Sequence, residues 1–278
     1  MRQRLSKILK IGGIEYYSLH QSYMCDFEQP PIRLSPSPEV FFCGPKDKKS
    51  AIQRDKNANS LSDSYKRIIL DFEESKPSSI NIVSVAKDYG IQHRRVYDLF
   101  NLLTALGICQ SVERGKLSWN GIGSINKVIR EAYSNIEGEC ITKPFRSVFC
   151  LGPSPSLGSI ATHFLCMYLY FGVDTLLLRQ VSSIFHDPRS DIKSLERRMY
   201  LVLNFLEIMG IVAHTLKTNE YKLVWNLSEP KRYGLLKRCQ IIDSQSPHSI
   251  ERLLNHIDCN YEYDVYSERA RQFPMLLN

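Results

Sequence analysis

Two arginine pairs stand 103 residues apart, and their type and spacing suit the recognition of a polyanion. Arg94 and Arg95 recur as Arg197 and Arg198, and each pair is followed by x-Tyr. A guanidinium group is a planar fork of donors that matches O6 and N7 of guanine, and each bidentate pair is worth about 1–3 kcal/mol of discrimination. Adjacent arginines at the start of a helix therefore predict contacts with successive G·C pairs.

The arginine pairs belong to a longer internal repeat. Residues 93–108 align without gaps on residues 196–211, and both segments lead into two strand-like runs that end in Trp-Asn. An apolar run closed by Gly-Pro precedes each copy, at 40–45 and 148–153. Self-similarity of this kind predicts two domains built in the same way.

Each copy reads as three helices followed by a hairpin. In the first copy, the spacing of apolar residues predicts helices over 64–75, 80–90 and 93–106, and 113–115 forms the hairpin turn. In the second copy the corresponding helices are expected near 159–172, 175–185 and 196–209. This order is typical of a winged helix, a variant of helix-turn-helix.

The predicted fold class is therefore α+β, mostly helical, with two tandem winged-helix domains. We expect an N-terminal extension or linker over 1–39, a first winged-helix domain over 40–122 and a linker with a short helix over 123–146. A second winged-helix domain is expected over 147–228 and a C-terminal extension over 229–278.

The third helix of each copy has one apolar face. Four residues recur at spacings of three and four, which is the spacing of a helix face turned to the core; they are Val96, Leu99, Leu103 and Leu106, repeated as Met199, Val202, Leu206 and Met209. The arginines then lie on the outer side, at the N-terminal end of the helix. DNA recognition helices contact base edges from that end.

The segment RRVYDLFNLLTALGI, with a hairpin ending in KLSWNG, resembles the DNA-binding domain of the E-two-F/DP cell-cycle transcription factors. The resemblance is close over about 60–121 and weaker over 156–227. It implies that both arginine pairs read a G·C-rich core, and that two such domains dimerise on DNA. Two domains in one chain resemble the atypical members, which form the pair within a single chain. Leu201 replaces the aspartate of the motif, which leaves two interpretations of the second copy open: it reads bases, or it serves mainly as a dimerisation partner.

The resulting candidate residues fall into two groups. The residues expected to bind DNA through the helices are Arg94, Arg95, Tyr97, Asp98, Asn101, Arg197, Arg198, Tyr200 and Asn204. Those expected to contact phosphates, which position a protein without specifying sequence, are Lys87, His93, Arg114, Lys116, Lys193, Lys217 and Lys222. The structural alternative is a solvated arginine face with an Arg94–Asp98 pair, worth only about 0.2–0.5 kcal/mol.

Composition and motifs exclude several other classes. The formal charge of +7 permits a polyanionic partner without demanding one. No run reaches the ~18 apolar residues of a membrane span, and no secretory signal is expected. The eight cysteines lack paired spacing, so we expect buried thiols rather than disulfides or zinc. No H-E-x-x-H, G-x-S-x-G or phosphate-cradling loop occurs, so we expect no enzyme, cofactor, metal or small-molecule substrate.

Four Ser-Pro pairs remain open to two interpretations. Ser35, Ser37, Ser154 and Ser246 each precede a proline. Such pairs are acceptors for proline-directed phosphorylation, and they are also ordinary turn chemistry.

The sequence thus predicts a nuclear, sequence-specific, double-stranded DNA-binding regulator of transcription of the cell-cycle type. Its expected partners are DNA and either its own second domain or a related winged-helix chain. The leading alternative is a winged-helix interaction subunit of a larger nuclear assembly, whose arginines contact an acidic protein. A third is an enzyme subunit that uses the domains only to hold nucleic acid.

Overall fold

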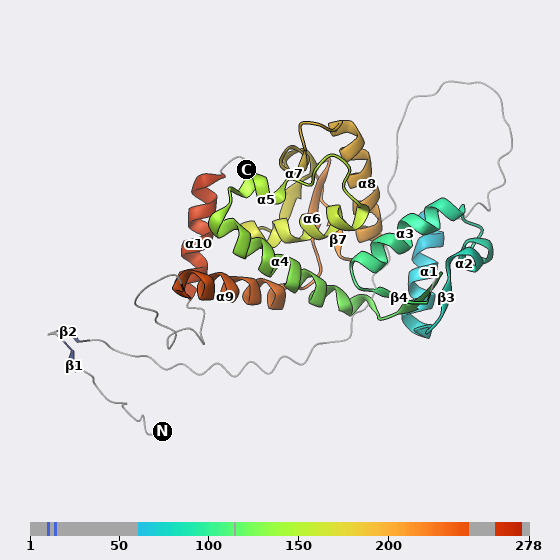
Figure 1. The fold of residues 1–278 in the computed structure, drawn as a ribbon, viewed down its shortest axis with the longest axis horizontal. Coiled ribbons are helices and arrows are strands. Elements are labelled where there is room, and N and C mark those ends of the chain that lie inside the picture. Colours follow the sequence, from blue (N-terminus) through green and yellow to red (C-terminus); the bar gives the residue numbers. More distant parts are fainter. Residues whose placement is uncertain (1–9, 12–13, 16–60, 114, 245–258, 274–278) are drawn as a thin grey trace. The chain divides into compact units, whose positions relative to one another are not determined.

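The computed structural model describes residues 10–11, 14–15, 61–113, 115–244 and 259–273. The chain divides into two compact units, residues 1–54 and 55–278. In the first unit, the two-residue strands β1 (Lys10–Ile11) and β2 (Ile14–Glu15) pair antiparallel. The remaining elements belong to the second unit (Figure 1).

The first repeat comprises α1 (Leu61–Ser75), β3 (Ile80–Asn81), α2 (Ile82–Asp88), α3 (His93–Ala105), β4 (Cys109–Glu113) and β5 (Lys116–Trp119). Its antiparallel sheet has the order β3-β5-β4. The prediction of a single helix over 80–90 is wrong for its first two residues, which form strand β3. Ile80 of this strand is buried and pairs with Leu117 of β5. Asn81 then caps α2, its Oδ1 accepting hydrogen bonds from the amides of Val83 (2.9 Å) and Ser84 (3.3 Å).

The second repeat has the same order of elements: α6 (Leu157–Phe171), β6 (Thr175–Leu177), α7 (Leu178–Phe185), α8 (Ile192–Ile208), β7 (Val212–His214) and β8 (Glu220–Leu223). Its sheet order, β6-β8-β7, repeats that of the first sheet. The helix predicted over 175–185 likewise begins with a strand, since Leu176 is buried opposite Tyr221. The described residues thus form a mostly helical α+β structure with small antiparallel sheets.

Further helices follow each repeat. The 3-10 helix η1 (Ile122–Ser124) leads into α4 (Ile125–Thr142), which is longer than the short helix predicted from the sequence, and α5 (Phe145–Phe149) follows. After the second repeat come α9 (Ser228–Ser244) and α10 (Cys259–Gln272).

Helices α4 and α9 lie side by side and run in the same direction. Arg130 pairs with Glu229 at 3.2 Å near their starts, and Glu137 faces Arg238 at 3.6 Å further along. The contact is close, because a Cβ atom at Gly234 would lie 2.3 Å from the ring of Tyr133. The two repeats are therefore joined by a pair of helices that follows them in sequence.

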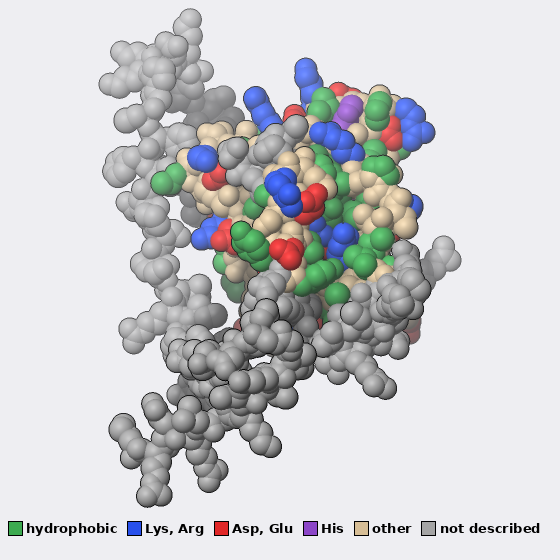
Figure 2. Space-filling model, turned by 90° about the vertical axis from the view of Figure 1, so that its left-hand side faces the viewer, with side chains coloured by type: hydrophobic (Ala, Val, Ile, Leu, Met, Phe, Trp, Pro, Cys, Tyr) green, Lys and Arg blue, Asp and Glu red, His purple; other side chains and the backbone are tan. Residues whose placement is uncertain are grey.

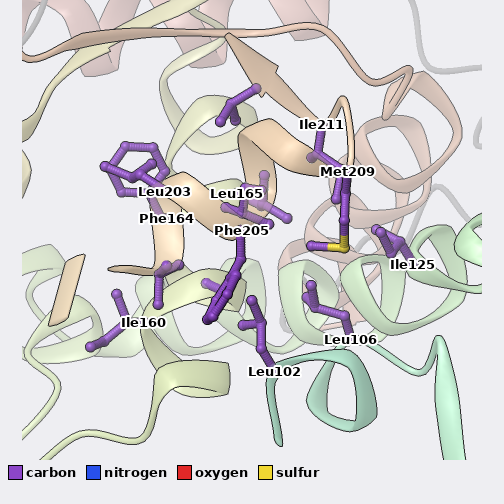
Figure 3. Close-up of a cluster of buried hydrophobic side chains, with 14 of the residues drawn as sticks. Leu102, Leu106, Ile125, Ile160, Phe164, Leu165, Leu203, Phe205, Met209 and Ile211 are labelled. Atoms are coloured by element: carbon purple, nitrogen blue, oxygen red, sulfur yellow. The ribbon is translucent and has the colours of Figure 1, made fainter. Parts of the chain in front are cut away.

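One hydrophobic core runs through both repeats (Figure 3). Leu102 of α3, Ile160 of α6 and Phe205 of α8 contribute to the same cluster of side chains. At the crossing of α3 and α6, a Cβ atom on Gly158 would lie 2.1 Å from Cβ of Ala105, so only glycine allows this approach. The edge of the Tyr65 ring meets Phe205 at 5.1 Å between centroids, which joins α1 to α8.

Helix α10 is fixed to this core by a buried ion pair. Nη2 of Arg269 donates to Oε2 of Glu137 at 2.6 Å, and Nη1 donates to the backbone oxygen of Tyr170 at 2.6 Å. The Glu137 side chain is fully buried. Although burial opposes the charged form of Arg269, the carboxylate of Glu137 raises the pKa of Arg269 above its ordinary value.

Candidate nucleic-acid interface

Helices α3 and α8 each bury the apolar face predicted from the sequence. In α3, Val96, Leu99 and Leu103 are fully buried, while Arg94 and Arg95 are exposed on the opposite side. In α8 the stripe that begins at Met199 is buried in the same way. Because burial of this stripe fixes the rotation of each helix about its axis, it also fixes the direction in which the arginines point.

All four motif arginines line one concave surface, which we term the arginine groove. Its volume is about 780 Å³, and it lies between α3, α8 and the segment that starts α6. The lining residues are Gln92, Arg94, Arg95, Asp98, Asn101, Ala105, Pro155, Ser156, Leu157, Gly158, Ser194, Arg197, Arg198 and Leu201. Residues that are far apart in the sequence thus meet because α3 packs on α6.

The arginine groove is electropositive, with four guanidinium groups against one carboxylate. That carboxylate, Asp98, pairs with Arg95 at 3.7 Å, and the Arg95 side chain remains 48% exposed. The Arg94–Asp98 pair of the structural alternative is therefore wrong, because Asp98 pairs with Arg95 instead. Among the described residues, neither Arg94 nor Arg197 has a hydrogen-bond or ion-pair partner, so both guanidinium groups face solvent.

Arg198 is held in a different way from its counterpart Arg95. Leu201 occupies the position that matches Asp98, and Arg198 instead donates from Nη1 to the backbone oxygen of Pro155 at 2.6 Å. A guanidinium group has five N–H donors, so this bond leaves others for a ligand. The two arginine pairs therefore have unequal surroundings within one groove.

The two helices also begin at different points relative to their arginines. Helix α3 starts at His93, which places Arg94 and Arg95 in its first turn. Helix α8 starts at Ile192, capped by Asp191, whose carboxylate accepts from the amides of Lys193 (3.2 Å) and Ser194 (3.0 Å). The prediction that the arginines stand at the N-terminal end of the helix is therefore right for α3 and wrong for α8. Asp191, a preferred N-cap residue, was the available sequence signal.

Three of the residues expected to bind DNA through the helices lie outside the groove lining. Tyr97 and Tyr200 are 43% and 42% exposed on the flanks of their helices. The Tyr200 hydroxyl donates to Oδ1 of Asn219 at 2.9 Å, which ties α8 to the hairpin of the second repeat. Asn204 is exposed on α8, whereas its counterpart Asn101 lines the groove.

Six of the candidate phosphate contacts are surface residues of the part of the chain that the structure describes. Lys87, His93, Lys193 and Lys222 are exposed. Lys116 pairs with Glu113 at 2.9 Å in a solvent-exposed contact of small energetic weight. Lys217 is also exposed and pairs at 3.3 Å with Glu220, whose side chain is only 12% exposed. Arg114 lies outside the described residues.

The two tryptophans that end the hairpins have structural roles. Nε1 of Trp119 donates to Glu73 of α1 at 2.9 Å, and the same carboxylate accepts from the amide of Ile122 at 3.1 Å. Nε1 of Trp225 donates to Oδ1 of Asn126 of α4 at 2.8 Å. The bonds to Glu73 tie the end of the first hairpin to α1. The Trp225 bond joins the second repeat to α4, the long helix that follows the first repeat.

Metal-type clusters and membrane-length helices were sought in the part of the chain that the structure describes. No cluster of His, Cys, Asp and Glu there has the arrangement of a metal site. None of the described helices is both long and apolar enough to cross a membrane. On the face shown in Figure 2, lysine and arginine side chains are mixed with acidic and apolar ones, so charge alone marks no site there.

Residues 57–121 match the model of the E-two-F/DP family winged-helix DNA-binding domain, the family that the first arginine motif resembles. None of the curated proteins compared with the chain matches it significantly. The matched segment contains α1 to β5, and with them the half of the arginine groove that α3 supplies.

Proposed function

We propose that this chain is a nuclear regulator of transcription that reads a G·C-rich duplex from the arginine groove. The proposal starts from residues 57–121, which form a winged-helix DNA-binding domain of the E-two-F/DP family. The carrying observation is that four arginines, contributed by both repeats, line the same groove. A major groove admits an α-helix and presents O6 and N7 of each guanine to such arginines.

The first repeat is proposed to supply most of the base discrimination. Arg94 and Arg95 lie in the first turn of α3, the part of a recognition helix that reaches base edges. Asp98 restrains Arg95 without burying it, and Asn101, one turn further on, also lines the groove. Asparagine pairs bidentately with adenine, so Asn101 is suited to a base that flanks the G·C core.

We propose that the second repeat is a second winged-helix domain. It would serve as the dimerisation partner of the first repeat within the same chain. The crossing of Ala105 and Gly158, the Tyr65–Phe205 contact and the parallel helices α4 and α9 all support this role. With its arginines in the second turn of α8 and Arg198 bonded to Pro155, this repeat is expected to read fewer bases. Lys87, His93, Lys116, Lys193, Lys217, Lys222 and Arg114 remain proposed phosphate contacts.

The test is a titration of the full chain onto a G·C-rich duplex and onto a scrambled duplex at several salt concentrations. Specific binding should exceed non-specific binding by about a thousandfold or more. Arg94→Ala with Arg95→Ala should reduce this ratio more than Arg197→Ala with Arg198→Ala. Arg232→Ala with Lys237→Ala, two exposed residues of α9 outside the groove, removes the same charge and should leave the ratio unchanged.

Two outcomes would contradict parts of this proposal. Equal affinity for both duplexes, or none, would exclude sequence reading and favour the protein-interaction subunit, whose arginines contact an acidic protein. Equal losses in the two double-alanine variants would show that both helices read bases to the same extent.

A further inference from the structure

The hairpin of the second repeat carries a leucine at its tip that packs against nothing. Leu216, between β7 and β8, is as exposed as in an extended peptide (108%), the highest value among the large apolar residues that the structure describes. Helix residues of the two repeats are offset by 103 positions but the hairpin tryptophans, Trp119 and Trp225, by 106, so this hairpin has three additional residues. Single exposed apolar residues are ordinary on a protein surface. A role for Leu216 therefore depends on how the hairpin holds it.

Hydrogen bonds fix the turn on both sides of Leu216. The Thr215 hydroxyl donates to Oε2 of Glu220 at 2.6 Å and accepts from the amide of Lys217 at 3.1 Å. In the backbone, the amide of Thr215 donates to the oxygen of Glu220 at 3.1 Å, and the amide of Glu220 donates to the oxygen of Lys217 at 3.2 Å. Asn219 takes the left-handed conformation (φ 63°) that asparagine tolerates better than most residues. The leucine is thus presented by an ordered turn.

The same turn is bonded to the helix that carries the second arginine pair. The Tyr200 hydroxyl of α8 donates to Oδ1 of Asn219 at 2.9 Å. Arg197, which lines the arginine groove, lies three residues before Tyr200, and such residues are neighbours on a helix surface. The exposed side of α8 therefore continues from Arg197 through Tyr200 to the tip. A duplex that contacts Arg197 extends towards Leu216.

We propose that Leu216 is an apolar wedge that enters the minor groove beside the G·C-rich core and partly unstacks one base step, an inference that rests on the proposed function. With α3 and α8 in the major groove, the neighbouring groove along the duplex is the minor one. Leucine is among the side chains that proteins insert between base pairs there, kinking the duplex by about 20–90°. Lys217, the next residue, is exposed and borders the same tip.

The wedge adds sequence preference without a hydrogen bond to a base. Unstacking costs least at the flexible pyrimidine–purine steps, TA and CA/TG. We therefore expect a preference for such a step at a fixed distance from the G·C-rich core. Arg197 and Lys217 on the same side of the repeat favour a polyanionic partner over an apolar protein surface.

The experiment uses the full chain and duplexes that keep the G·C-rich core and carry 2-aminopurine at successive flanking positions. The fluorescence of this base rises when it unstacks. We expect a rise at one step, lost in Leu216→Ala and kept in Leu216→Met. Energy transfer between end labels should show a bend that follows the same pattern. Leu216→Ala should bind about tenfold more weakly, because a leucine side chain is no longer buried, with an unchanged salt slope, because no phosphate contact is lost.

Two further variants separate the wedge from general effects. Leu216→Lys can add one phosphate contact, so it should steepen the plot of log K against log salt by about 0.9 and still abolish the fluorescence rise. Val224→Ala removes another exposed apolar side chain (59%) of the same repeat, away from the tip, and should change neither property. Urea unfolding of Leu216→Ala should match that of the unaltered chain, since Leu216 packs against nothing.

The outcomes distinguish failure of this inference from failure of the proposed function. No rise at any flanking position, or a rise that persists in Leu216→Ala, overturns the wedge even if the chain discriminates between G·C-rich and scrambled duplexes. Unchanged affinity and bending in Leu216→Ala also overturn it, and would assign the side chain to a protein contact. A rise that depends on Leu216, on duplexes that the chain does not distinguish by their G·C content, supports the wedge and refutes reading of the core.

Discussion

The crossing of Ala105 in α3 and Gly158 in α6 gives a sharp test of how the two repeats pack. A Cβ atom at Gly158 would lie 2.1 Å from Cβ of Ala105. Non-bonded carbons prefer about 3.5–4.0 Å, so Gly158→Ala should push the helices apart by roughly 1.5 Å. Overpacking of this kind typically costs about 1–3 kcal/mol.

A matched control lies in α4. A Cβ atom at Gly138 would meet Cδ1 of Ile241 at 3.2 Å, and that atom is the flexible end of a side chain. Replacing glycine by alanine inside a helix gains up to about 1 kcal/mol, and this gain is smaller at Gly158, the second residue of α6, than at Gly138 within α4. Gly158→Ala should therefore be less stable than Gly138→Ala by the overpacking cost, about 1–3 kcal/mol.

The assay is urea unfolding followed by circular dichroism, in a double-mutant cycle with Ala105→Gly. Ala105→Gly alone should cost about 1 kcal/mol of helix stability. Combined with Gly158→Ala it restores the space at the crossing, so the cycle should show a favourable coupling of about 0.5–3 kcal/mol. Because both residues line the arginine groove, Gly158→Ala should also lower discrimination between the two duplexes. Equal stability of the two alanine variants, with no coupling, would refute this packing of α3 on α6.

Three further predictions concern single residues. Leu201→Asp restores the carboxylate that matches Asp98, so it should draw Arg198 from the Pro155 oxygen and raise the G·C-rich to scrambled affinity ratio; an unchanged ratio would contradict this. Arg269→Met removes the closer of the two arginines that pair with the buried carboxylate of Glu137 and leaves Arg238 at 3.6 Å, so it should cost about 3–5 kcal/mol in urea unfolding, most of it recovered when Glu137→Met is added. Burial lowers the pKa of His163, so stability should fall as pH drops below the usual value near 6.5 towards the folded-state pKa, because the unfolded chain binds the proton first. His163→Gln should flatten the plot of the urea midpoint against pH in that window, and an unaltered slope would assign it to other groups.

The parts of the fold that sequence predicted are those with a local signal. The apolar stripe that begins at Val96 repeats at helix spacing, and the turn at 113–115 separates two strand-like runs. Strands β3 and β6 have only two and three residues, too short for any periodic pattern, and each is defined by a partner strand about 35–45 residues away in the chain. The predictions of 80–90 and 175–185 as uninterrupted helices therefore missed them.

The burial of individual polar side chains could not be predicted from the sequence pattern. Glutamate is ordinarily an exposed residue, so nothing marks Glu137 as fully buried. Its burial depends on Arg269, which is 132 residues away and offsets the loss of water with a charged hydrogen bond from its guanidinium group. Likewise, the motif identifies the arginines, but their meeting in one groove depends on Gly158, whose role is visible only when α3 lies against α6.

The repeated fold and the unequal arginines lead to a specific expectation about the DNA site. Symmetric protein pairs bind symmetric half-sites, because the same side chains reach the same bases on both sides. Here Arg95 is restrained by Asp98 in the first turn of α3, while Arg198 is held by a backbone oxygen in the second turn of α8. The arginines hold the same position relative to the buried stripe of each helix, so the difference lies in their surroundings: α8 has an additional turn ahead of its arginines, and the bond to Pro155 occupies one donor of Arg198. The preferred duplex should therefore tolerate substitution in one half of its G·C-rich core far better than in the other.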